Sequence, residues 1–335
     1  MLRSIAISIE RACFVESLLR LMHLISLATD TFGVITISLV SLLSLLGLLC
    51  IYRSLYFQLR IQRRRFLHLS YFNGPWVTRI TLILISIWWG FGEIIRLSFL
   101  HGAGKLFSSQ TCQKNVCKFY VLSNLGFAEP SVFLMLAFLL HAALQEREFT
   151  LSQRWNRKTI GCVVLLCFPA ILWQLALVFI GPKFANREKS DKRVDMMRLF
   201  TSTSSLSDGT VTCTYPLLST AFLGAFYIIL ITYVTYIGSR MLSLVINKGL
   251  RRRIYVLVFS VILFLPMRAL LLGFSVLPRP GGLAYEAIAF LAFVMMLFCT
   301  MVGIVMLVYF PIADTLALGE PEHVEMEGVP FDDYY

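Results

Sequence analysis

The sequence predicts an all-α, polytopic membrane protein: a bundle of seven transmembrane helices with the N-terminus outside and the C-terminus in the cytoplasm. Hydrophobic residues occupy 58% of the 335 positions and charged residues only 15%, which is more apolar surface than a soluble domain can bury. Seven apolar runs reach the length of about 20 residues that an α-helix needs to cross the hydrocarbon core. The cysteines and basic residues then predict the orientation.

The predicted spans fill most of the chain, so no hydrophilic stretch is long enough for a separate soluble domain. The seven spans are 32–52, 76–100, 121–144, 159–180, 215–238, 254–276 and 283–310. We therefore expect a transmembrane bundle over residues 31–315, with one short segment on either side of it.

The two flanking segments differ in character. In residues 1–30, Arg3, Glu10 and Ser17 recur every seven residues, which predicts an amphipathic helix at the membrane interface; an extra, poorly inserted segment is the alternative. Residues 316–335 are acidic and contain no Lys or Arg. This composition predicts a disordered cytoplasmic tail.

The orientation depends on cysteine, because positive charge alone nearly ties the two sides. The loops after the first, third and fifth spans are rich in arginine, but those after the second and fourth also carry basic residues. Disulfides persist outside the cytosol. The cysteines outside the spans all lie on the side of the N-terminus: Cys13, Cys112, Cys117 and Cys213. This side is therefore predicted to face out, with a disulfide from Cys112 or Cys117 to Cys213; free thiols are the alternative.

The net charge of +11 is concentrated at the ends of the spans, as in RIQRRR (60–65) and KGLRRR (248–253). This pattern is typical of cytoplasmic anchoring to the lipid bilayer and its anionic head groups, and we expect no nucleic-acid partner. An acidic partner protein is the second interpretation of the same basic loops.

An arginine interrupts the apolar run FSVILFLPMRALLLGF (259–274). At 1.5 Å per residue, Arg268 lies about 22 Å along its helix, in the outer third of the hydrocarbon core. Glu93 and Glu129 reach a similar depth on the second and third spans. Because an unpaired charge in lipid is costly, Arg268 is expected to pair with Glu93 or Glu129.

The other polar residues at this depth predict a cavity open to the outside that binds a small organic ligand. The candidate ligand-pocket residues are Glu93, Arg96, Glu129, Gln174, Arg268, Tyr285 and Glu286. Aromatic residues of the same spans would suit an amphipathic or indole-like molecule. A buried structural ion pair that fixes helix register is the alternative. Pro266 permits a kink beside Arg268, and such kinks also occur in membrane bundles that do not switch.

The sequence does not predict an enzyme. The histidines are scattered, with no H-x-x-x-H pair and no His/Asp/Ser set for zinc, and the paired histidines that haem requires are missing. We therefore expect no catalytic residue, no metal and no cofactor. A transporter would favour a repeated three-helix unit, but the prolines of the first three spans do not recur in the last three.

Glu146-Arg147, in LQEREF, resembles the acidic-arginine pair of class A G-protein-coupled receptors. However, the tryptophan of the sixth helix and the asparagine-proline pair of the seventh are missing, so the chain does not look like a member of that class. The order QLRIQRRRFLHL, KFYVLSNLGFAEPSVFLMLAFLLHAALQ and NKGLRRRIYVLVFSVILFLPMRALLLGF resembles the plant seven-transmembrane candidate G-protein-coupled receptor family. That family includes phytomelatonin-receptor-like and tobamovirus multiplication protein-like members, and the similarity covers roughly residues 30–315.

The plant resemblance implies a multi-pass protein of the plasma membrane, or alternatively of the vacuolar or another endomembrane. It also implies coupling to a heterotrimeric G-protein alpha subunit or a scaffolding role. We expect a receptor for a small extracellular ligand; a membrane scaffold or trafficking protein and a small-solute transporter are the alternatives. The residues expected to face the G-protein are Arg63, Arg64, Arg65, Glu146, Arg147, Arg251, Arg252 and Arg253.

Overall fold

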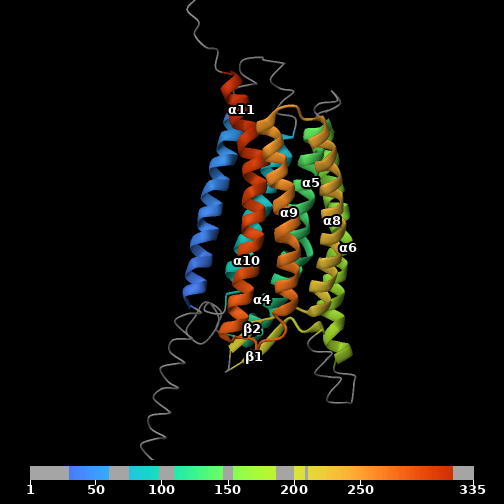
Figure 1. Ribbon diagram of the computed structural model, residues 1–335. Coiled ribbons are helices and arrows are strands. Elements are labelled where there is room, and N and C mark those ends of the chain that lie inside the picture. The colour runs from blue at the N-terminus through green and yellow to red at the C-terminus, as the bar shows by residue number, and fades with distance from the viewer. Residues whose placement is uncertain are drawn as a thin grey trace, which may run out of the picture.

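The structure, a computed structural model, describes residues 30–59, 75–97, 109–145, 154–185, 200–207 and 210–319. Within these ranges, seven helices are long and apolar enough to cross a membrane. They stand side by side along one axis (Figure 1). The seven helices indicate a multi-pass membrane protein, as the apolar runs predict.

The spans are built from the following elements. The first helix is Asp30–Leu59, drawn in blue without a label in Figure 1. The single-helix spans that follow are α3 (Trp76–Ile95), α6 (Arg154–Ala185), α8 (Leu217–Leu244) and α9 (Lys248–Phe274). The third span joins α4 (Gln110–Tyr120), the π-helix η2 (Val121–Ala128) and α5 (Glu129–Gln145), and the last joins α10 (Leu283–Ile304), the π-helix η4 (Val305–Tyr309) and α11 (Phe310–Gly319).

The third span forms the centre of the bundle. In its apolar window 83% of the residues are buried, against 22% in the first helix. On the periphery, large aliphatic side chains point outward: Leu165, Ile228 and Ile229 are 68–72% exposed. Exposed aliphatic side chains in the middle of long helices are what contact with lipid tails requires, because lipid offers them an apolar solvent.

A short β-hairpin lies at one end of the bundle, beside α4 (Figure 1). Strands β1 (Ser204–Ser207) and β2 (Thr210–Cys213) pair antiparallel, with Ser204 opposite Cys213. A disulfide joins Cys117 of α4 to Cys213 of β2, and the Val211 N–H donates to Gln113 Oε1 at 3.0 Å. The hairpin is therefore fixed to the beginning of the third span, and we call this end of the molecule the hairpin end.

Both π-helices occur directly before an X-Pro dipeptide. η2 ends at Ala128, before Glu129-Pro130, and η4 ends at Tyr309, before Phe310-Pro311. Proline has no N–H to donate, and its ring displaces the carbonyl four residues earlier, which in both spans lies inside the π-helix. The wider turn absorbs this mismatch, and π-turns of this kind occur frequently at functional sites.

Several helix ends differ from the sequence prediction. The third span begins at Gln110 rather than at 121, because the polar turns of α4 continue the helix beyond its apolar part. α9 begins at Lys248, where the Asn247 side chain caps it by accepting from the Gly249 N–H at 2.9 Å. The last helix ends at Gly319, inside the segment expected to be a disordered tail. The expectations for residues 1–29 and 320–335 lie outside the described residues.

Candidate functional site

Arg268 lies at the centre of a network that joins four helices. The residue is 1% exposed. Nε donates to Glu129 Oε1 on α5, Nη2 donates to Glu93 Oε1 on α3 at 3.4 Å, and Nη1 donates to the Ala292 carbonyl on α10 at 2.8 Å. The predicted ion pair is therefore present, and Arg268 binds both carboxylates rather than one of them.

Glu93 carries the network toward the hairpin end. Its Oε2 accepts from Arg96 Nε at 3.3 Å, and its Oε1 accepts from the Tyr120 hydroxyl at 3.0 Å. The Tyr120 hydroxyl lies 3.0 Å from that of Tyr215, and the Arg96 guanidinium lies 5.7 Å from the Tyr215 ring centroid. Burial raises the pKa of the Tyr215 hydroxyl, so this group remains neutral and can act as donor or acceptor.

Glu129 is fully buried. Besides the bond from Arg268, its Oε1 accepts from the Tyr227 hydroxyl at 2.7 Å. The Arg268 guanidinium also lies 5.6 Å from the ring centroid of Trp89, so an aromatic face covers the cation. Glu129 directly follows η2, and the π-turn thus determines where this carboxylate meets α9.

Several buried polar side-chain atoms make no hydrogen bond in the structure. Within the part of the chain that the structure describes, they include Trp89 Nε1, Asn124 Oδ1, Glu129 Oε2 and Gln174 Nε2. Asn124 is held beside the network by its Nδ2, which donates to the Trp89 carbonyl at 3.0 Å. An unsatisfied buried polar group is costly. These atoms are therefore the ones that gain most from a bound polar molecule.

The structure also locates the other predicted pocket residues. Gln174 Oε1 accepts from Ser219 Oγ at 2.7 Å, on α8. The Tyr285 hydroxyl donates to the Cys213 carbonyl at 2.5 Å, which connects α10 to the hairpin. Glu286 is 6% exposed, in the first turn of α10. The four charged residues Glu93, Arg96, Glu129 and Arg268 form one network, whereas Gln174 and Tyr285 bond to groups outside it.

The network is enclosed by the bundle. The exposed fractions of Glu93, Arg96, Glu129 and Arg268 are 4% or less, so these side chains face one another and are closed to solvent in this structure. Sequence reasoning missed the three tyrosines that complete the hydrogen bonds, Tyr120, Tyr215 and Tyr227. All three tyrosines lie in or next to apolar spans, and this position in the sequence indicated that their hydroxyls need buried partners.

The opposite end of the bundle carries the basic turn of α9. Arg251 and Arg252 are exposed, whereas Arg253 Nη1 donates to Asp314 Oδ2 on α11 at 2.5 Å and its guanidinium lies 4.2 Å from the Phe310 ring centroid. Of the residues expected to face a G-protein, Arg63, Arg64, Arg65, Glu146 and Arg147 lie outside the described residues.

The cysteines decide between the predicted disulfide partners. Cys117 is bonded to Cys213, and Cys112 is an exposed free thiol. Among the described residues, no group of three or more His, Cys, Asp or Glu side chains is placed to hold a metal ion.

A family model described as "Uncharacterised conserved protein UCP031277" matches residues 22–326, which include all seven helices and the Arg268 network. The chain belongs to this family. No curated protein matches the chain. The family model shows no link to the plant receptors or the tobamovirus multiplication proteins.

Proposed function

We propose that the chain is a seven-transmembrane receptor-like protein of the plasma membrane, which senses a small extracellular ligand and signals to a heterotrimeric G-protein alpha subunit. The observation that carries the proposal is the bonding of one buried guanidinium, Arg268, to Glu129, Glu93 and the Ala292 carbonyl on three other helices. Ionisable groups inside a membrane bundle are expensive and are by default candidates for a functional site.

The proposed orientation has the hairpin end outside. Its support is the Cys117–Cys213 disulfide at this end, because disulfides persist in oxidising compartments. The first helix begins at the hairpin end (Figure 1), which corresponds to an N-terminus outside. The basic turn with Arg251 and Arg252 then lies in the cytoplasm, where positively charged loops accumulate.

The ligand would act by competing inside the Arg268 network. The bond from Arg268 to Glu93 is 3.4 Å long, the longest of the network. Because breaking a buried ion pair costs about 3–5 kcal/mol, the ligand has to replace the group that it removes. A carboxylate would serve Arg268, and an ammonium, amide or hydroxyl would serve Glu93. The unpaired Asn124 Oδ1 offers a further hydrogen bond beside the network.

The response would travel along α9. This helix carries Arg251 and Arg252 in its first turns and Arg268 near its other end, about 25 Å away by helical rise. Pro266 lies inside it and removes a backbone hydrogen bond, so the helix can bend at this point. A change in what Arg268 bonds to would therefore change the position of the basic turn, which is the surface offered to an acidic partner.

The test is capture of a G-protein alpha subunit by the purified protein in nanodiscs, with the subunit loaded either with GDP or with a GTP analogue. The variant R251Q/R252Q removes two exposed charges from the basic turn. A matched control, K114Q/R279Q, removes two exposed charges from the hairpin end. We expect preferential capture of the GDP form, lost in R251Q/R252Q and kept in the control.

The other outcomes separate the alternative functions. Equal capture of both nucleotide states would contradict a receptor and favour a scaffold, because a scaffold does not distinguish them. Absence of capture in either state would contradict the proposal, and uptake of small solutes into proteoliposomes would then test a transporter.

A further inference from the structure

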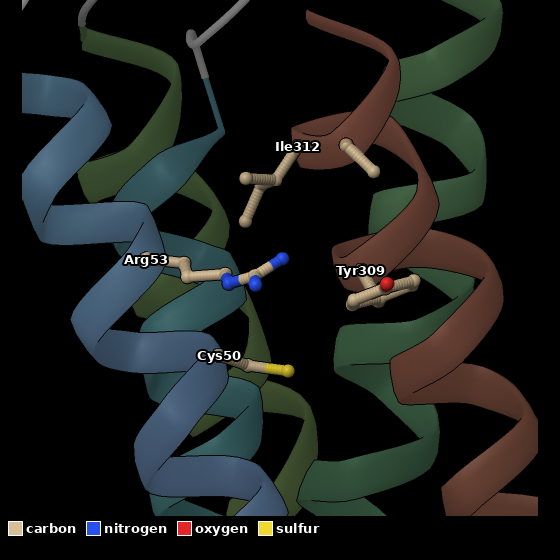
Figure 2. A pocket seen from close by; sticks show the side chains of 5 residues that line it. Cys50, Arg53, Tyr309 and Ile312 are labelled. Carbon is tan, nitrogen blue, oxygen red and sulfur yellow. The ribbon is translucent and has the colours of Figure 1, made fainter. Parts of the chain in front are cut away.

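A pocket lies between the first and the last helix, near the end of the bundle that carries the basic turn of α9. It is lined by Cys50 and Arg53 of the first helix and by Tyr309, Ile312 and Ala313 of the last. Figure 2 shows the Arg53 guanidinium and the Cys50 sulfur pointing from the first helix toward Tyr309 and Ile312. Among the residues that the structure describes, the pocket thus has an apolar wall and one cationic group, and no carboxylate lines it.

Arg53 differs from three other arginines of the transmembrane region in having no carboxylate partner among the described residues. Arg268 and Arg96 bind carboxylates inside the bundle, and Arg253 binds Asp314. Within the described residues, Arg53 makes no hydrogen bond or ion pair and is exposed. The hydroxyl of Tyr309 is likewise not hydrogen-bonded to any described residue, and Tyr309 is 41% exposed. An open cation and an open donor therefore share one pocket.

The level of the pocket along the bundle indicates what fills it. Tyrosines on three helices are exposed near this end: Tyr52 and Tyr56 beside Arg53, Tyr255 on α9 and Tyr309, with exposed fractions of 67%, 52%, 60% and 41%. Tyrosines at helix ends gather at the depth of the lipid head groups. Arg53 is therefore at the depth of lipid phosphates, and the apolar wall of Ile312 and Ala313 lies where an acyl chain begins.

We propose that this pocket binds one anionic phospholipid, with the phosphate on the Arg53 guanidinium and the Tyr309 hydroxyl and the glycerol end of the acyl chains against Ile312 and Ala313. Basic pockets between transmembrane helices recognise phosphate head groups by charge-assisted hydrogen bonds. The bound lipid joins the first helix to the last. This proposal does not depend on the receptor function, because lipid binding requires only that the protein is inserted in a bilayer.

The site adjoins the contact that holds the basic turn of α9. The Tyr309 ring packs against the Phe310 ring with centroids 5.7 Å apart. The Arg253 guanidinium lies over the same Phe310 ring, 4.2 Å from its centroid. A lipid held by Tyr309 therefore touches the same stretch of the last helix that anchors α9. Through this stretch, we expect the lipid composition of the membrane to influence the basic turn of α9.

The experiment uses Cys50 as a reporter inside the pocket and Cys162, another half-buried thiol on α6, as an internal reference. The full chain is placed in nanodiscs of phosphatidylcholine or of phosphatidylglycerol and treated with N-ethylmaleimide, and the modified peptides are quantified by mass spectrometry. We expect phosphatidylglycerol to slow the labelling of Cys50 relative to Cys162 about fivefold, the effect of one basic side chain on an anionic lipid.

Two variants test the pocket itself. R53Q removes the cation and A313L fills the apolar wall without changing the charge, so both are expected to abolish the difference between the two lipids. R240Q, which removes an exposed arginine at the same end but outside the pocket, is expected to keep it. Equal labelling of wild-type Cys50 in both lipids, or protection that survives in both R53Q and A313L, overturns the proposal.

The source of the phosphate is tested separately. Glycerol 3-phosphate is added to phosphatidylcholine nanodiscs at the concentration that the phosphatidylglycerol head groups reach. We expect no protection of Cys50 by the soluble compound, because it lacks the acyl chains. Equal protection would show a site for a free phosphate compound and would overturn the assignment to a lipid.

Discussion

Replacement of Arg268 by methionine is expected to be the most destabilising single change in the polar network. R268M leaves Glu129, which is 0% exposed, without a cation, and it leaves Glu93, which is 1% exposed, with Arg96 alone. It also removes the bond to the Ala292 carbonyl. Breaking a buried ion pair costs about 3–5 kcal/mol. For a chain of 335 residues, each kcal/mol lowers the melting temperature by about 1–2 °C, so we expect a fall of at least about 4 °C.

A double variant separates the charge from the packing. In R268M/E129Q a neutral amide replaces the Glu129 carboxylate. Glu93 keeps its bonds to Arg96 and Tyr120, at 3.3 and 3.0 Å. Because a buried pair is often replaced by neutral groups at little cost, the double variant should recover more than half of the loss.

The assay is thermal unfolding in detergent, followed by tryptophan fluorescence. M267L, at the neighbouring residue that is 42% exposed to the outside of the bundle, serves as the control and should melt with the wild type. A fall of less than about 2 °C for R268M, or a double variant no more stable than R268M, would refute the reasoning that Arg268 is a buried, paired cation.

Three further changes test other parts of the structure. C117S removes the disulfide and should lower the free energy of unfolding by about 2–5 kcal/mol. Its melting temperature should no longer respond to reductant, whereas C112S, which changes a free thiol, should behave as the wild type. G303A brings a methyl group into a leucine of α5 and should cost about 1–3 kcal/mol, whereas G161A meets open space and should cost nothing. D314N breaks a half-exposed pair and should change stability by less than about 1 kcal/mol; a larger loss in chemical denaturation would contradict it.

The pairing of Arg268 was predictable because helical rise is fixed. Once the spans are placed by their apolar length, 1.5 Å per residue gives the depth of each charge. Arg268, Glu93 and Glu129 could therefore be matched without knowing how the helices pack. The choice between the two carboxylates could not be made in this way, because it depends on the rotation of each helix about its axis, and the structure has both bonds.

The hairpin and α4 could not be read from hydrophobic length. α4 is polar on average, and its Cys117 and Gln113 hold the hairpin through bonds to residues about a hundred positions away. One local indication existed: Asp208-Gly209, between short runs that can alternate, is a strong hairpin-turn pair. The π-helices are a comparable case, since Pro130 and Pro311 predict a disturbed helix but not the direction in which the turn relaxes.

The central claim is that the Arg268 network and the basic turn of α9 are coupled, and one variant tests it most directly. E93Q removes the charge of the carboxylate that holds Arg268 by the longest bond, 3.4 Å, while Glu129 keeps its own. Capture of the GDP-loaded and GTP-analogue-loaded alpha subunit is compared between wild type and E93Q in nanodiscs. We expect the ratio of the two to change at least about threefold in E93Q, with a melting temperature that shows a folded protein. An unchanged ratio in a folded E93Q would contradict the coupling.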